Sequence, residues 1–316
     1  MNSPISQSSV AVVIPVYNRA AILKETLTYV LAQTLLPDAL IVVDDESTDN
    51  TAAEVEQWLE QHAARVHWEL IRASKSTVAG ARNRGLSRVE SVDYVAFLDS
   101  DDHWPEDFLE RCVNMLDSEP DAVAATTERF YRCSPGVKAQ HKGGLEMVSD
   151  PITWFFKYGA GVSSCSLLRK SVVQELGAWP EVTLGEDTQF FGALTLKGPW
   201  VFAEGAPVTF HIGNGGDTSE EGNLSRKYAD REEQWVKDFE AIYAEVLNQQ
   251  VAVDHGPLKM MLGVRWHRAY KMRLRVGDVV AARACLKHAI RWNPRCWKYR
   301  KHALLLSLTK HWVRAK

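Results

Sequence analysis

Three aspartates lie within four positions, directly after a short apolar run. They are Asp99, Asp101 and Asp102, and the run is 95–98. Four apolar residues in a row predict a buried strand, and open α/β sheets bind their ligands at the carboxyl ends of strands. A divalent cation bridging to a phosphate would relieve the repulsion among these carboxylates. The alternative is a solvated turn in which Asp102 or Ser100 caps a helix that starts near Pro105.

Apolar runs alternate with segments of helical spacing in the first third of the chain. Strands are predicted at 10–16, 39–43, 66–71 and 95–98, and helices at 19–33, 51–61, 78–88 and from about 105. This alternation predicts a parallel, doubly wound sheet. Asp44 and Asp45 end the second strand and Tyr17 follows the first, so we expect these side chains on the same sheet edge as the aspartates.

Two common phosphate-binding motifs are missing from the sequence. The first strand is followed by Pro-Val-Tyr-Asn-Arg without a G-x-G-x-x-G, and the chain has no G-x-x-x-x-G-K-[ST]. A phosphate-bearing ligand would therefore be held by a metal and side chains. The five cysteines form no C-x-x-C pair, which favours a reducing compartment. With no recognisable signal peptide, we expect a cytoplasmic protein.

Charge is distributed unevenly along the chain. Residues 251–316 contain 16 Lys and Arg against two acids, a net charge of +14, whereas the remainder carries −17. This difference predicts a boundary near residue 250 and an anionic partner for the basic region, such as a membrane surface or an acidic substrate. Nucleic acid is not expected, because the rest of the chain is acidic and contains no recognised binding module.

Four segments in a fixed order resemble the inverting glycosyltransferase family two. They are IPVYNRAAILKETLTYVLAQTL, IVVDDESTDNT, AGARNRGL and VAFLDSDD. The resemblance covers about residues 10–211 and implies the GT-A fold, a Rossmann-like, mostly parallel sheet flanked by helices. We expect a catalytic domain at 1–222, with a nucleotide-binding half at about 8–118 and an acceptor half at about 119–222. A basic helical region would follow at 223–316.

The same resemblance implies a donor and metal site. The implied donor-binding residues are Pro15, Tyr17, Asp45, Arg82, Asn83, Asp99 and Ser100. Tyr17 would lie against the nucleotide base, Asp45 would bond the uracil imide, and Arg82 and Asn83 would contact the ribose or diphosphate. Mg²⁺ or Mn²⁺ would be held by Asp101, Asp102 and His211, and it would neutralise the leaving diphosphate. For His211 a purely structural role is the alternative.

Glu186 and Asp187 resemble the family's E-D motif. Asp187 is the candidate base, because inversion needs a carboxylate that takes the acceptor's proton during attack. The alternative is that both acids only favour the first turn of a helix. Glycine-rich residues 213–219 are either a lid over the donor or a linker.

Two positions depart from the family pattern, and several aromatic residues are expected in the core. Trp179 lies in Gly-Ala-Trp-Pro-Glu where many relatives have Gly-x-Phe-Asp-Glu, and Glu46 replaces the usual glycine. Both departures weaken any inference about the sugar. We expect Trp179 and the aromatics at 154–156 to be core residues, although stacking on an acceptor sugar is the alternative.

Residues 277–308 resemble a single tetratricopeptide-type helix pair, which must pack on another surface. Its Arg, Lys and Trp residues suit an anionic membrane surface, which would place the protein on the inner face of the cell membrane; a solvated basic face is the alternative. The sequence thus predicts a metal-dependent inverting transferase that uses a nucleotide sugar, with UDP as the expected nucleotide. The acceptor would be a glycan or lipid-linked glycan of the cell surface. A non-catalytic scaffold and a sugar-nucleotide pyrophosphorylase are the alternatives.

Overall fold

A computed structural model describes residues 8–133, 137–141, 144–159, 162–182, 184–212 and 232–313. The chain forms two compact units. The first comprises Met1–Pro151 and Ala160–Gly222, and the second comprises Ile152–Gly159 and Asn223–Lys316. The glycine-rich segment 213–219, predicted to be a lid or a linker, lies outside the described residues.

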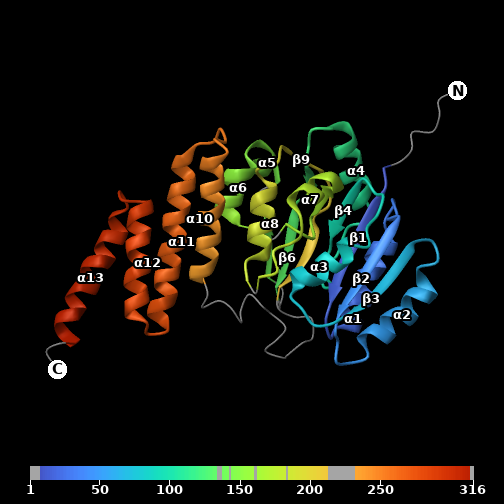
Figure 1. Cartoon of the computed structure of the whole chain (residues 1–316), viewed down its shortest axis with the longest axis horizontal. Helices are drawn as coiled ribbons and strands as arrows, with labels where there is room; N and C mark the ends of the chain where they lie inside the picture. The colour runs from blue at the N-terminus through green and yellow to red at the C-terminus, as the bar shows by residue number, and fades with distance from the viewer. Residues whose placement is uncertain are drawn as a thin grey trace. The chain divides into compact units, whose positions relative to one another are not determined.

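A seven-stranded sheet organises the first unit, in the order β3-β2-β1-β4-β8-β5-β9. Figure 1 labels four neighbouring strands of this sheet, β3, β2, β1 and β4. Its strands are β1 (Val10–Val16), β2 (Ala39–Asp45), β3 (His67–Ala73), β4 (Tyr94–Phe97), β5 (Ala124–Thr126), β8 (Ser166–Arg169) and β9 (Trp200–Phe202). All neighbours are parallel except β8, which runs antiparallel to β4 and β5. The predicted GT-A type of mostly parallel sheet is confirmed.

The central strand β1 is apolar because both of its faces are covered. Its residues from Val10 to Ile14 are fully buried, which is typical of parallel strands between layers of helices. The helices of this unit are α1 (Ala20–Leu31), α2 (Thr51–His62), α3 (Val78–Leu86), α4 (Phe108–Ser118), α5 (Gly144–Ser149), α7 (Lys170–Leu176) and α8 (Glu186–Leu194). The predicted early strands and helices are all present, with their ends shifted by a few residues.

Helix α3 packs closely on the sheet at Gly85. A Cβ atom at this position would overlap Cγ1 of Val13 and lie 3.1 Å from Cγ2 of Val43. The helix begins at Thr77, whose hydroxyl accepts a hydrogen bond from the amide of Gly80 at 3.1 Å. Capping and close packing together fix the position of α3 over β1 and β2.

A second, three-stranded sheet extends the first unit. It consists of β10 (Val208–Ile212), β6 (Arg129–Cys133) and β7 (Val137–His141), in that order. An isolated antiparallel bridge joins His103 to Thr209, with both backbone hydrogen bonds at 2.9 Å. This bridge brings β10 beside the segment that follows β4.

The second unit is helical. Its helices are α6 (Pro151–Tyr158), α10 (Glu232–Asn248), α11 (His255–Arg275), α12 (Val279–Trp292) and α13 (Trp297–Val313). Phe155 and Phe156 of α6 are buried and pack on Phe239 of α10, with ring centroids 4.9 and 5.5 Å apart. The prediction that these aromatics are core residues is confirmed.

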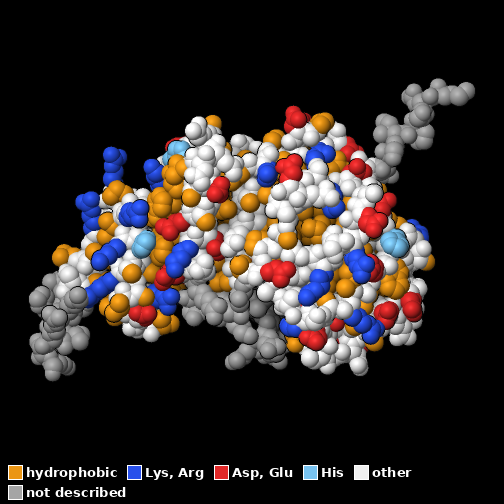
Figure 2. All heavy atoms as spheres, viewed as in Figure 1, with side chains coloured by type: hydrophobic (Ala, Val, Ile, Leu, Met, Phe, Trp, Pro, Cys, Tyr) orange, Lys and Arg blue, Asp and Glu red, His pale blue; other side chains and the backbone are white. Residues whose placement is uncertain are grey.

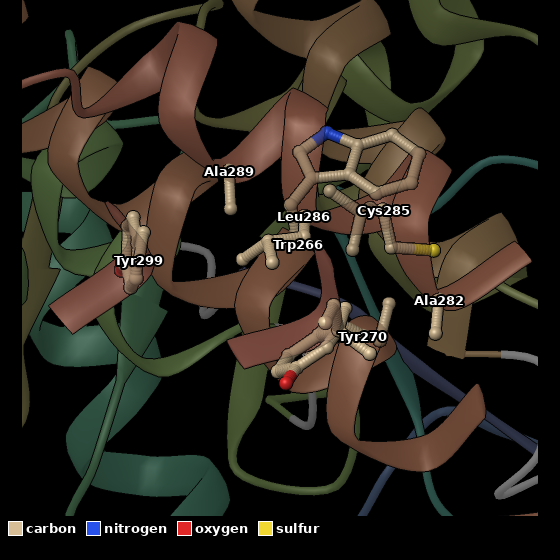
Figure 3. Close-up of a cluster of buried hydrophobic side chains, with 10 residues drawn as sticks. Trp266, Tyr270, Ala282, Cys285, Leu286, Ala289 and Tyr299 are labelled. Carbon is tan, nitrogen blue, oxygen red and sulfur yellow. The ribbon is translucent and has the colours of Figure 1, made fainter. Parts of the chain in front are cut away.

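The predicted helix pair corresponds to α12 and α13, but α12 packs more extensively on α11. Gly277, with a φ of 79°, makes the turn between α11 and α12. Ala282, Cys285, Leu286 and Ala289 of α12 pack with Trp266 and Tyr270 of α11 in one buried cluster (Figure 3). The apolar face of α12 is therefore buried within this unit. No helix among the described residues is both long enough and apolar enough to cross a bilayer.

Candidate active site

The carboxyl ends of β1, β2 and β4 meet at one edge of the large sheet. These strands are adjacent and parallel, with Val16 opposite Asp44 and Val13 opposite Phe97. Tyr17, Asp45 and Asp99 therefore leave neighbouring strands on the same side, as the sequence predicted. Pro15 lies within β1, opposite Val43.

Arg82 joins two groups of acids that are far apart in the sequence. One guanidinium nitrogen lies 2.7 Å from Asp99 and the other 3.0 Å from Asp187. The Arg82 side chain is only 3% exposed, whereas the two acids are 37% and 33% exposed. Burial alone would lower the pKa of Arg82, but Asp99 and Asp187 outweigh it and raise this pKa above its ordinary value. Arg82 is thus a fixed cation between Asp99, in the segment with three aspartates, and Asp187 of the E-D motif.

The Arg82 guanidinium packs on a stack of two aromatic rings. Its guanidinium carbon lies 4.4 Å from the centroid of the Trp179 ring, and Trp179 stacks on Phe190 at 4.0 Å with nearly parallel rings. Trp179 is 1% exposed, which confirms its prediction as a core residue. The position that departs from the family pattern therefore provides a cation–π platform for the central arginine.

Asn83 holds this tryptophan in place. Its side-chain amide donates to the Trp179 carbonyl at 2.9 Å, and its side-chain oxygen accepts from the Trp179 amide at 2.7 Å. We predicted Asn83 as a donor contact, and here both ends of its side chain bind protein backbone. Two adjacent residues of α3 therefore act together: Arg82 carries the charge, and Asn83 fixes the backbone of Trp179, whose ring contacts the Arg82 guanidinium.

Glu186 and Asp187 begin helix α8, after Gly185 in a left-handed conformation. Burial, and then the charge of Asp187, raise the pKa of Glu186 to about 7. Burial also raises the pKa of Asp187, against the opposing effect of Arg82. The position of both acids in the first turn agrees with the helix-dipole alternative, but the bond from Asp187 to Arg82 adds an interaction that a dipole does not require.

Asp101 and Asp102 have different surroundings. Asp102 is 4% exposed, and its carboxylate accepts a hydrogen bond from the amide of His211 at 3.2 Å. Asp101 lies 3.4 Å from the guanidinium of Arg19. Burial, and then repulsion from Asp99, raise the pKa of both acids. The capping alternative is wrong, because α4 begins after Asp107 and has no side-chain cap.

His211 approaches the aspartates from β10. Its Nδ1 lies 2.7 Å from the carbonyl oxygen of Asp101, so Nδ1 carries the proton in the neutral ring and Nε2 keeps a lone pair. His103 lies beside it, with ring centroids 4.4 Å apart, and stacks on Tyr29. The second sheet therefore brings an imidazole to the acidic segment.

The chemistry of these donors suits Mg²⁺ or Mn²⁺, although they are not arranged as a finished site. Two carboxylates with raised pKa values and an imidazole lone pair are groups that a divalent cation would stabilise. Among the described side chains, no three His, Cys, Asp or Glu are grouped as metal ligands. Asp101 would have to exchange Arg19 for the metal.

Ser100 has a structural contact. It is 5% exposed, and its carbonyl accepts a hydrogen bond from the Thr26 hydroxyl at 2.9 Å. Ser164 supports the same segment from the end of the loop before β8, because its hydroxyl accepts from the Asp99 amide at 3.1 Å. These bonds fix the backbone that carries the aspartates.

A lysine contacts both Tyr17 and Asp45, the two residues that the resemblance assigns to the nucleobase. The Lys75 ammonium is 3.0 Å from the centroid of the Tyr17 ring and 3.4 Å from the Asp45 carboxylate. Asp45 also accepts hydrogen bonds from the amide and hydroxyl of Ser76, both at 2.9 Å. Glu46 has a φ of 62°, a conformation that favours the glycine usual at this position.

The sequence interpretation missed two cations, Arg19 and Lys75. Arg19 directly follows Tyr17-Asn18, which was a usable signal, since the chain after β1 passes the aspartates. Lys75 lies in a polar Ser-Lys-Ser loop that has no distinctive pattern.

A family profile decides the classification. The profile described as "Glycosyl transferase family 2" matches residues 11–177, more than half of the chain. The chain belongs to glycosyl transferase family 2. The matched part contains β1 to β4, Arg82 and the aspartate motif, whereas Asp187 and His211 lie beyond it.

Curated relatives align with about a third of the chain. The succinoglycan biosynthesis protein ExoW of Rhizobium meliloti (strain 1021) is 40% identical over 104 residues, which are 32% of this chain and 32% of ExoW. The Escherichia coli UDP-Glc:alpha-D-GlcNAc-diphosphoundecaprenol beta-1,3-glucosyltransferase WfgD is 34% identical over 107 residues, 34% of this chain and 40% of WfgD. The aligned segment therefore spans less than half of either relative.

A solved structure supports the fold over most of the chain. The structure of TarS 1–349 from S. aureus in complex with UDP-GlcNAc superposes with a TM-score of 0.64. The match covers 90% of this chain and 81% of the TarS chain at 17% sequence identity. At this identity the likeness shows a shared fold, which is the GT-A architecture expected for family 2.

Proposed function

We propose that this chain is a metal-dependent inverting glycosyltransferase that transfers a sugar from a UDP-sugar to a glycan or lipid-linked acceptor. The observation that carries the proposal is the Arg82 guanidinium bonded to both Asp99 and Asp187. Through these two bonds, one side chain connects Asp99, a predicted donor-binding residue, with Asp187, the predicted base. WfgD, named for a UDP-Glc donor and a diphosphoundecaprenol acceptor, and ExoW, named for succinoglycan biosynthesis, support cell-surface polysaccharide assembly as the setting.

In this proposal the protein's own groups divide the work of a direct displacement. Asp187 takes the proton from the acceptor hydroxyl as its oxygen attacks the anomeric carbon, and the diphosphate leaves from the opposite face. Arg82 orients the Asp187 carboxylate and places a positive charge at the donor side. Mg²⁺ or Mn²⁺ held by Asp101, Asp102 and His211 would neutralise the departing diphosphate. The raised pKa of Asp187 makes its carboxylate a better base than an exposed aspartate.

A ligand panel tests this proposal. UDP-, GDP-, CMP- and dTDP-sugars are compared by thermal shift with and without Mn²⁺, and each hit is then assayed for hydrolysis and transfer. A donor at about a hundred times its dissociation constant adds about 2.7 kcal/mol to the free energy of unfolding. A metal-dependent shift with UDP-sugars is the expected result. Folded protein that responds to no nucleotide sugar would contradict the proposal and favour a non-catalytic scaffold.

We also propose that the second unit binds an anionic membrane surface. Exposed Lys and Arg side chains gather over α11 to α13 on the face shown in Figure 2. At the turn between α12 and α13, Arg291, Arg295 and Lys298 are exposed, and Trp297 between them is 71% exposed. A tryptophan among cations suits the interface of a bilayer that carries acidic headgroups. We call these four residues the basic turn.

A further inference from the structure

One lysine lies where the nucleobase of the proposed donor would bind. The Lys75 ammonium is 3.0 Å from the centroid of the Tyr17 ring and 3.4 Å from Oδ2 of Asp45. It therefore occupies the side of the ring that faces the carboxylate. We call the space between the Tyr17 ring and Asp45 the base seat.

A base and this ammonium cannot share the base seat. Carbon atoms in contact are about 3.5–4.0 Å apart, so a base stacked on this side of Tyr17 needs the volume that the ammonium fills. The Asp45 carboxylate also already has protein partners. Oδ1 of Asp45 accepts from the amide and hydroxyl of Ser76, and Oδ2, the oxygen left for an imide N–H, faces Lys75. Binding of a base must therefore remove Lys75 from both contacts.

The loop that carries Lys75 is anchored, but its side chain is free to move. The Lys75 amide donates to Oε2 of Glu46 at 2.9 Å, and the next residue, Ser76, is bonded to Asp45. The Lys75 side chain is 47% exposed, so it can turn into solvent without disturbing the backbone. Among the described residues, the ammonium is held by one cation–π contact and one partly exposed ion pair, both of modest strength.

We propose that Lys75 fills the base seat in the free protein and is displaced when a nucleobase binds. This inference rests on the proposed function, which assigns Tyr17 and Asp45 to the base. A competitor built into the protein lowers the apparent affinity for every ligand that uses the seat by the same factor. It does not affect a ligand that binds only at the metal and diphosphate positions. Lys75 thus sets how tightly the nucleotide part of the donor is held.

The first experiment observes the lysine itself. Two-dimensional ¹H–¹³C spectra of protein labelled at the lysine ε-carbons are recorded, and the Lys75 signal is assigned by its loss in Lys75→Ala. The ring current of Tyr17 should shift this ε-methylene signal upfield, and Tyr17→Leu should abolish the shift. UDP should return the signal to the position of an exposed lysine. A Lys75 signal at the exposed position in the free protein would overturn the proposal.

The second experiment measures binding by calorimetry with Mn²⁺ present. Lys75→Ala should bind UDP about two- to fivefold more tightly than the unmodified protein, in keeping with the usual strength of an exposed cation–π contact. Binding of inorganic pyrophosphate, which lacks a base, should not change. Lys24→Ala is the matched control, because Lys24 pairs with Glu54 on α2 and does not contact the seat.

The outcomes separate this inference from the proposed function. If UDP binds but Lys75→Ala binds it equally or more weakly, Lys75 is no competitor, although the enzyme assignment stands. An equal gain for UDP and pyrophosphate would also overturn the inference. If neither protein binds any nucleotide, the proposed function is contradicted, and the Lys75 signal alone then decides whether the lysine fills the seat.

Discussion

Arg82 donates a 3.0 Å hydrogen bond to Asp187, a residue 105 positions further along the chain. Because Arg82 also bonds Asp99, its replacement would leave two acids facing each other without a cation. We expect Arg82→Lys to keep the charge but lose one of the two bonds, and to reduce kcat/KM about 10- to 100-fold. Arg82→Ala should reduce it further and lower the melting temperature. Arg88→Ala is the control, since Arg88 is exposed and pairs with Glu69; equal losses in both proteins would contradict the assigned role of Arg82.

Asp187→Asn separates catalysis from binding. The amide has nearly the same shape but cannot accept the acceptor's proton, so turnover should fall about 10²- to 10⁴-fold. The dissociation constant of the nucleotide sugar, measured by calorimetry, should change little. Asp121→Asn, at an exposed position, should leave both quantities unchanged. Full turnover in Asp187→Asn would exclude this residue as the base.

Glu186 should make the protein less stable as the pH rises. Its pKa is about 7 in the folded protein against an ordinary value of 4.5, so between these values the folded state binds more protons than the unfolded state. The free energy of unfolding must therefore fall as the pH rises through this range. Glu186→Gln should lose much of this slope, leaving the part contributed by other acids with raised pKa values, among them Asp187, Asp101 and Asp102.

Thermal unfolding at several pH values between 4.5 and 7 measures the effect of Glu186. The melting temperature of Glu186→Gln minus that of the unmodified protein should increase as the pH increases. Glu54→Gln, a change at a half-exposed surface position, should give a curve parallel to that of the unmodified protein. A parallel curve for Glu186→Gln as well would mean that the pKa of Glu186 is not raised.

Asn83→Ala tests the support beneath Arg82. The substitution removes two hydrogen bonds to the Trp179 backbone, and the free energy of unfolding should fall by about 1–3 kcal/mol in chemical denaturation. Activity should fall too, because the Trp179 ring would no longer be held under the guanidinium. Asn50→Ala is a matched control, since Asn50 precedes α2 without a side-chain capping bond. Similar stability losses for both variants would argue against a special role for Asn83.

The basic turn can be tested by reversing its charges. Replacing Arg291, Arg295 and Lys298 with Glu should abolish cosedimentation with vesicles that contain anionic phospholipid, because each basic residue near such a surface contributes about 1 kcal/mol. The unmodified protein should bind these vesicles at low salt, bind less at high salt, and not bind neutral vesicles. Absence of cosedimentation in the unmodified protein would refute membrane binding, and unchanged binding in the variant would refute the role of the basic turn.

The local pattern predicted the nucleotide-binding half well, because there the periodicity of each segment agrees with its burial. Strand β1 spans Val10–Val16 as predicted, and the acids after β2 and β4 lie on one edge. The strands of the second half are harder to find. Strand β5 is only Ala124–Thr126 and β8 only Ser166–Arg169, and the antiparallel insertion of β8 depends on pairing with distant segments.

Side-chain partners were less predictable than residue positions. The motifs marked Arg82 and Asp187, but only the fold shows that they bond to each other. Lys75 and Arg19 have long side chains whose ends lie far from their own backbone, so sequence spacing does not show which acid they reach. The capping alternative for Asp102 failed for a related reason, because α4 begins at Phe108, six residues later.

The position of Arg82 in the site depends on the lack of a side chain at Gly85. A methyl group here would overlap Val13 and press on Val43, so any larger residue must lift α3 away from the sheet. Arg82 lies about one helical turn earlier on the same helix, and its two hydrogen bonds, at 2.7 and 3.0 Å, leave little room for such a displacement. Chemical activity would thus be lost through a steric change on the buried side of the helix, at a residue that no substrate ever meets.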